Sequence, residues 1–235
     1  MKSLETLKEN INRLYEEIDS AALKAGRKKG EVLLCAVTKT RSVEEINMAI
    51  SAGITDIGEN RVQEIVDKYP NVAPVNWHMV GHLQTNKVKY IIDKVSLIHS
   101  VDSFKLAEEI DKRAGQGGKA MDVLIQVNSA MEESKFGITA DETGALIEEI
   151  LEKCPNIKIK GLMCMAPYFD DSEDAAVYFA AVKGLYDKYS EEIRHDRLDF
   201  SILSMGMSHD FEVAIREGAN VIRIGTAIFG ERDYR

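Results

Sequence analysis

The feature that most constrains the fold is a repeated alternation of short apolar runs with amphipathic helical patterns. The apolar runs predict eight strands, at 32–38, 54–58, 76–81, 96–100, 122–128, 157–163, 199–204 and 220–225. Helical patterns lie between them, near 43–52, 60–69, 85–93, 103–115, 140–153, 172–190 and 208–218. Strands that are apolar on both faces and joined by helices indicate a parallel sheet.

Eight such strands predict an α/β protein with a closed (β/α)8 TIM barrel, and an open doubly wound sheet is the alternative. The length of 235 residues suits one barrel, so we expect a single domain over residues 1–235. Within residues 1–28, apolar side chains at three- and four-residue steps predict an extra N-terminal helix ending near Gly26. Expected helix caps are Ser42, Asp102 or Ser103, Asp141, Ser172 and Ser208.

Net charge and cysteine content indicate which partners and which cellular compartment this protein is expected to have. The net charge of -9 argues against nucleic acid or an anionic membrane as a main partner. The N-terminal stretch lacks the continuous apolar segment of a signal peptide, and no run is long enough to span a membrane. The three cysteines have no metal-site spacing, and two of them, Cys35 and Cys164, lie in apolar runs. We therefore expect thiols in a reducing compartment and a cytoplasmic protein.

In a barrel of this kind the functional site lies where the strands end at their carboxyl side. The last two strands end in "SMGMS" and "IGTAIFG", two short glycine-containing loops. Glycine lets backbone N–H groups approach an anion, and the hydroxyls of Ser204, Ser208 and Thr226 add donors. The two loops together predict a phosphate site, although each alone is also typical of an ordinary turn.

Two cationic residues stand at the same end of the predicted barrel. Lys39 follows the first strand, where a lysine either reaches solvent or forms a Schiff base with an aldehyde. Arg223 alternates with Ile222 and Ile224, so we expect it to face the barrel interior. There it would pair with a carboxylate or contact a ring nitrogen or phosphate of a ligand. The five histidines show no metal spacing, and His78 is interpreted as a hydrogen-bonded core residue.

These features resemble the barrel that binds pyridoxal 5'-phosphate (PLP) in proteins of the alanine racemase type, known as PLP fold type III. Within that group the chain is similar to the pyridoxal phosphate homeostasis protein family. The similarity rests on "AVTKT", "IGENRVQE", "WHMVGHLQTNK", "GLMCMAP", "SMGMSHDFEVAI" and "RIGTAIFG", which run in order through essentially the whole chain. The stretch "WHMVGHLQTNK" is the most specific of them.

The resemblance implies roles for individual residues. Lys39 is expected to carry PLP as a Schiff base, and Arg223 to face the pyridine nitrogen and weaken the ring as an electron sink. The residues expected to hold the phosphate are Ser204, Gly206, Ser208, Gly225 and Thr226. Those expected around the ring and the mouth are Asn60, Met163 and His82. Lys135 matches a position where racemases place a cation near the phenolic oxygen.

The resemblance also implies a function in PLP (vitamin B6) homeostasis rather than robust turnover. Racemases carry a second domain that supplies a catalytic tyrosine and helps to form a dimer, whereas this chain ends ten residues after Gly225. We therefore expect a monomer that holds PLP and delivers it to apo forms of PLP-dependent enzymes. The alternatives are a PLP-dependent amino-acid racemase or decarboxylase of low activity and a Schiff-base aldolase acting on a phosphosugar.

Overall fold

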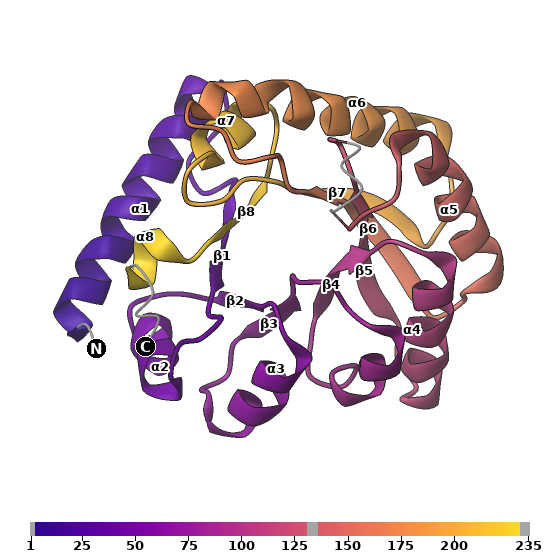
Figure 1. Cartoon of the computed structure of the whole chain (residues 1–235), viewed down its shortest axis with the longest axis horizontal. Helices are drawn as coiled ribbons and strands as arrows, with labels where there is room; N and C mark the ends of the chain where they lie inside the picture. Colours follow the sequence, from indigo (N-terminus) through magenta and orange to yellow (C-terminus); the bar gives the residue numbers. More distant parts are fainter. Residues whose placement is uncertain (1–2, 131–135, 231–235) are drawn as a thin grey trace.

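The eight predicted strands form a closed parallel barrel in sequence order (Figure 1). The structure is a computed structural model that describes residues 3–130 and 136–230. The strands are β1 (Leu33–Val37), β2 (Asp56–Glu59), β3 (Asn76–Met79), β4 (Leu97–Val101), β5 (Met121–Val127), β6 (Ile157–Cys164), β7 (Leu198–Ser204) and β8 (Val221–Ile224). Pairing of β8 with β1 closes the ring. The TIM barrel prediction is confirmed, and the open doubly wound sheet is excluded.

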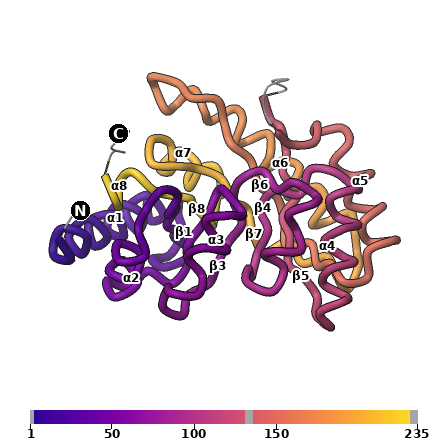
Figure 2. Tube along the Cα trace, turned by 60° about the horizontal axis from the view of Figure 1, so that its bottom comes forward, coloured from indigo at the N-terminus to yellow at the C-terminus, as the bar shows by residue number. Residues whose placement is uncertain are grey.

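Helices surround the barrel on its outer face (Figure 1). The α-helices are α1 (Leu4–Lys24), α2 (Val43–Ser51), α3 (Val62–Lys68), α4 (Phe104–Gln116), α5 (Ala140–Lys153), α6 (Ala176–Glu192), α7 (Phe211–Arg216) and α8 (Thr226–Phe229). Short 3-10 helices are η1 (Tyr69–Asn71), η2 (Thr85–Tyr90) and η3 (Ser172–Ala175). The predicted N-terminal helix is α1, which packs beside α2, α7 and α8 (Figures 1 and 2).

Most predicted helix boundaries hold, and the differences have local causes. Ser42 forms a capping box with Glu45, as its position predicts. The segment near 85–93 forms only the short η2, a 3-10 helix. The Asp141, Ser172 and Ser208 caps are wrong, because Thr139, Asp171 and Asp210 hold the cap positions of α5, η3 and α7. Helix α5 begins earlier, after Thr139, and α7 begins after Asp210 because that carboxylate accepts the Met207 backbone N–H at 2.6 Å and keeps 206–210 as a loop.

The apolar core lies between the barrel and its helices. The predicted apolar face of α1 is buried, with Leu7, Ile11 and Leu14 almost fully excluded from solvent. The three cysteine side chains are buried and unpaired by disulfides. The interior of the barrel is less apolar than this outer core. Several polar side chains are buried there: Asp56, His78, His99, Gln126, Ser204 and Arg223.

Within residues 3–130 and 136–230, no helix combines the length and the apolar character needed to cross a membrane.

Candidate functional site

A cavity of about 250 Å³ opens at the carboxyl ends of the strands. This is the end at which a parallel barrel gathers its loops, because every strand points the same way. Side chains and backbone from the ends of β1, β2, β3, β6, β7 and β8 line it. Six residues singled out from the sequence lie in its wall: Lys39, Asn60, Ser208, Arg223, Gly225 and Thr226.

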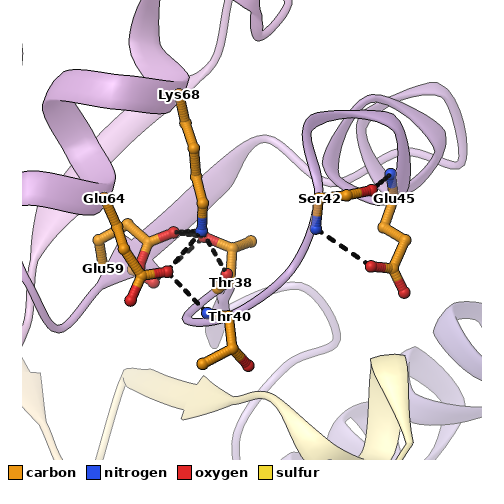
Figure 3. Close-up of polar contacts among 8 residues, drawn as sticks. Thr38, Thr40, Ser42, Glu45, Glu59, Glu64 and Lys68 are labelled. Carbon is orange, nitrogen blue, oxygen red and sulfur yellow. Dashed lines mark hydrogen bonds and ion pairs between the residues drawn. The ribbon is translucent and has the colours of Figure 1, made fainter. Parts of the chain in front are cut away.

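Lys39 is carried by a sharp turn at the end of β1. The next residue, Thr40, has a φ of 65°, which is unusual for a β-branched residue. Its backbone N–H donates to Glu64 Oε2 at 2.7 Å, which helps to hold the turn (Figure 3). The preceding Thr38 is fully buried. The backbone on both sides of Lys39 is therefore fixed by the fold.

A buried ion-pair network supports this turn from behind (Figure 3). The ammonium of Lys68 donates to the Thr38 carbonyl at 3.0 Å and to Glu59 Oε1 and Glu64 Oε2, both at 2.7 Å. Thr38 Oγ1 also donates to Glu59 Oε1, at 2.7 Å. The network links the end of β1 to the end of β2 and to α3, so the base of the turn is held by three elements.

The pKa values of the two carboxylates in the network are shifted in opposite directions. Burial raises the pKa of Glu59 above its usual value, and the nearby Lys68 only partly offsets this effect. Burial acts in the same sense on Glu64, but hydrogen bonds from Lys68 and from the Thr40 backbone prevail and lower the pKa of Glu64. Of the two carboxylates, Glu59 therefore depends more on Lys68 to remain ionised.

The loops after β7 and β8 form the opposite wall. Gly206 has a φ of 91°, and a Cβ there would lie 2.6 Å from the Cβ of Ala214, so the turn requires glycine. A Cβ at Gly225 would lie 3.1 Å from the Val37 carbonyl oxygen, where β8 passes close to β1. Ser208 and Thr226 line the cavity beside these close approaches.

Arg223 forms part of the inner wall and is held from below. Its Nη1 donates to Ser204 Oγ at 2.6 Å, and its Nη2 donates to the Cys164 carbonyl at 2.9 Å. Among the described residues it has no salt bridge, so the expected alternative of an internal ion pair is not seen there. A buried guanidinium held through two of its N–H groups keeps others available to the cavity.

Four other predicted residues do not line this cavity. Ser204 and Met163 are partners in adjacent strands and lie below its wall, with Met163 packed on Leu97 and Leu124. Gly206 forms the turn behind the wall. His82 stacks on Phe136, with ring centroids 3.7 Å apart, and lies 3.6 Å from an Asp102 carboxylate oxygen.

The structure adds residues that the sequence reasoning missed, namely Arg41, Met165, Met207 and His209. Arg41 is held by the Gly230 carbonyl at 2.6 Å and lies over the Phe229 ring. The position of Arg41 only two residues after Lys39 could have indicated that it lies near the same site. Met165 lies two residues beyond Met163, which puts it on the same face of β6 but nearer the mouth. Lys135 lies outside the described residues.

A second, largely apolar cavity of about 350 Å³ adjoins the first. The two share Met165, Met207 and His209. The rest of its wall comes from Phe136, from residues 166–169 after β6, and from Ser172, Ala175 and Asp210. The mouth of the barrel therefore offers a cation-lined space and an apolar space side by side.

Comparison with known proteins agrees with this geometry. Residues 3–233 match the family model described as the alanine racemase N-terminal domain. The pyridoxal phosphate homeostasis protein of Aquifex aeolicus is 45% identical over 228 residues, covering 96% of this chain and 98% of the relative. PipY of Synechococcus elongatus, solved without PLP, is 31% identical with a TM-score of 0.84, covering 95% and 100% of the two chains. PipY with PLP bound is 30% identical, covers the same shares and gives a TM-score of 0.81.

Proposed function

Because the chain belongs to the pyridoxal phosphate homeostasis protein family, within the alanine racemase N-terminal domain family, we propose that it binds PLP covalently through Lys39 and acts in PLP homeostasis. When bound, PLP supplies an aldehyde that condenses reversibly with primary amines. The proposal treats residues 1–235 as one PLP-binding barrel domain, with 1–28 as its leading helix.

The charge of the cavity is the observation that carries the proposal. Three cations, Lys39, Arg41 and Arg223, line it, and none of its described lining residues is a carboxylate. This is notable in a chain of net charge -9. A site of this kind suits an anionic ligand, and the hydroxyls of Ser208 and Thr226 add hydrogen-bond donors for a phosphate. The Lys39 amine and the hydrogen-bond donors for the phosphate line the same cavity, as binding of PLP requires.

We assign the remaining roles from the resemblance to PLP-binding barrels, and the positions around the cavity support them. Ser208, Gly225 and Thr226 would contact the phosphate, while Ser204 and Gly206 would support that wall from behind. Arg223 would donate to the pyridine nitrogen; a guanidinium cannot protonate that atom at ordinary pH, so it would not strengthen the ring as an electron sink.

Around the ring, Asn60 forms the side wall, Met163 supports Met165 from below, and His82 stands near the mouth. These roles come from the family resemblance, and the location of Asn60 in the cavity wall supports its part of the assignment.

The wider function that we propose is storage of PLP and its delivery to apo forms of PLP-dependent enzymes, by a monomer in the cytoplasm. The apolar cavity beside the site and the exposed Tyr168 on its rim leave the bound cofactor reachable from outside. The free, buried cysteines fit a reducing compartment.

Borohydride trapping tests the covalent assignment. The purified protein, loaded with PLP, is reduced, digested and mapped by mass spectrometry. We expect the pyridoxyl group on Lys39, its loss in Lys39→Ala, and its retention in the control Lys87→Ala. An adduct that maps to Lys87 or Lys135, or that persists in Lys39→Ala, would show the assignment to be wrong.

The adjoining apolar cavity favours a second candidate function, a PLP-dependent amino-acid racemase or decarboxylase of low activity, because it has room for an amino-acid side chain. Incubation of the loaded protein with L-alanine and other amino acids in deuterated water separates the two functions. Deuterium incorporation at the α-carbon or racemisation at about 1 per second or faster, lost in Lys39→Ala, would favour the enzyme. Negligible exchange would favour storage.

A further inference from the structure

Five buried polar side chains form a continuous series through the barrel interior. Asp56 Oδ1 lies 3.0 Å from His78 Nε2, and His78 Nδ1 lies 2.9 Å from His99 Nε2. His99 Nδ1 lies 3.1 Å from Ser204 Oγ, which accepts from Arg223 Nη1 at 2.6 Å. We call this set the polar series. It runs from the amino end of the barrel to the cavity, in a space that branched apolar side chains usually fill.

With Asp56 ionised and both imidazoles neutral, counting donors and acceptors gives one direction for every hydrogen bond in the polar series. Arg223 can only donate, so Ser204 accepts from it and uses its own hydroxyl hydrogen toward His99 Nδ1. His99 then carries its proton on Nε2 and donates to His78 Nδ1. His78 in turn carries its proton on Nε2 and donates to Asp56. In this arrangement each imidazole nitrogen of the series has the partner it needs.

The surroundings keep this arrangement in place. Burial lowers the pKa of His99 well below its usual range, and positive charge on its neighbours, including the Arg223 guanidinium, acts in the same sense. Burial opposes ionisation of Asp56, but hydrogen bonds from His78, Thr55 and Asn76 prevail and lower the pKa of that carboxyl. The series thus has an ionised acceptor, Asp56, at one end and a donor, Arg223, at the other, with a neutral His99 between them.

We propose that the polar series positions Arg223, with Asp56 imposing one histidine tautomer on each ring so that the Ser204 oxygen is always presented to the guanidinium. Through this contact and the Cys164 carbonyl, the guanidinium is held with its free N–H groups toward the cavity. His78, His99 and Asp56 are then positioning residues that never touch the ligand. Only the effect on PLP rests on the proposed function; the tautomers are a property of the empty protein.

Nitrogen-15 NMR of the wild-type protein without PLP tests the series directly. We expect both His78 and His99 as neutral rings protonated on Nε2 at neutral pH. A His99 ring that is charged, or protonated on Nδ1, would overturn the proposal. This measurement needs no variant, so it stands even where a substitution prevents folding.

Substitution of Asp56 tests whether the far end sets the orientation. Asp56→Ala removes the acceptor, and we expect His99 to lose its single tautomer and PLP to bind about five- to tenfold more weakly, the equivalent of one hydrogen bond. Asp56→Asn keeps an acceptor oxygen and should retain both the tautomer and most of the affinity. Asp122→Ala, a half-buried aspartate on β5 outside the series, is the matched control and should change neither.

The outcomes separate the two proposals. A folded Asp56→Ala protein with unchanged His99 tautomer, or with unchanged PLP affinity, would overturn the positioning role. A wild-type protein that fails to bind PLP would overturn the proposed function, while the tautomer measurements would still decide whether Asp56 orders the series.

Discussion

We expect Lys68→Met to destabilise the barrel by about 3 kcal/mol, the lower part of the range for removing one partner of a buried ion pair. Lys68 donates to two carboxylates and a carbonyl, and Glu59 is fully buried. In the variant only Thr38 Oγ1 would still donate to Glu59, because Glu59 Oε2 has no hydrogen-bond partner among the described residues. Methionine fills a similar volume, so the loss of stability comes mainly from leaving the buried Glu59 carboxylate without its cation.

The destabilisation should depend on pH with a definite sign. The pKa of Glu59 is raised in the folded state, so its ionisation opposes folding as the pH rises through that value. Without Lys68 this pKa rises further. The pKa of Glu64 is lowered, so its contribution to stability is lost as the pH falls through its folded value, below 4.5. Both effects make the difference between wild type and variant largest at neutral pH. It should be smaller near pH 4.5, where the penalty for ionised Glu59 is relieved while most of the Glu64 contribution remains.

Urea unfolding followed by circular dichroism at the two pH values measures this difference. The matched control is Lys153→Met, which removes an exposed i,i+4 partner of Glu149 and should leave the urea midpoint nearly unchanged. A double variant Glu59→Leu with Lys68→Met should recover much of the lost stability, because it leaves no charge in the fully buried position of Glu59, and Glu64 is partly exposed. If Lys68→Met lowers the free energy of unfolding no more than the control does at neutral pH, the network does not stabilise the Lys39 turn.

Three further predictions follow from the site and the core. Replacing Ser208 and Thr226 together by alanine should weaken PLP binding about tenfold or more while leaving unphosphorylated pyridoxal nearly unaffected, as measured by titration of the visible absorbance; equal weakening would place the phosphate elsewhere. Gly206→Ala should cost about 1–3 kcal/mol in urea unfolding, because the residue has positive φ and no space for a Cβ; an unchanged midpoint would contradict this reading of the turn. Burial raises the pKa of all three cysteine thiols, so a thiol reagent should label none in the folded protein and three in urea; rapid labelling without urea would show that the core opens.

Local sequence patterns were enough to predict the barrel and the place of the main candidate site residues. The alternation of apolar runs and helical periodicities depends on neighbouring residues, and it gave all eight strands to within a few residues. Lys39 at a strand end and the glycine-containing loops after β7 and β8 also follow from local order, because parallel strands bring their carboxyl ends together. Alternation along β8 likewise placed Arg223 inside the barrel.

The height of each side chain within the barrel was decided only by the pairing of strands distant in sequence. Ser204 pairs with Val221, so Arg223 lies two residues nearer the mouth and Ser204 points in below it. Met163 pairs with Ser204 and shares that lower level, which leaves Met165 to line the cavity. The polar series joins residues 56, 78, 99, 204 and 223 across five strands. No local pattern carries this information, because register is set by the stagger that closes the whole barrel.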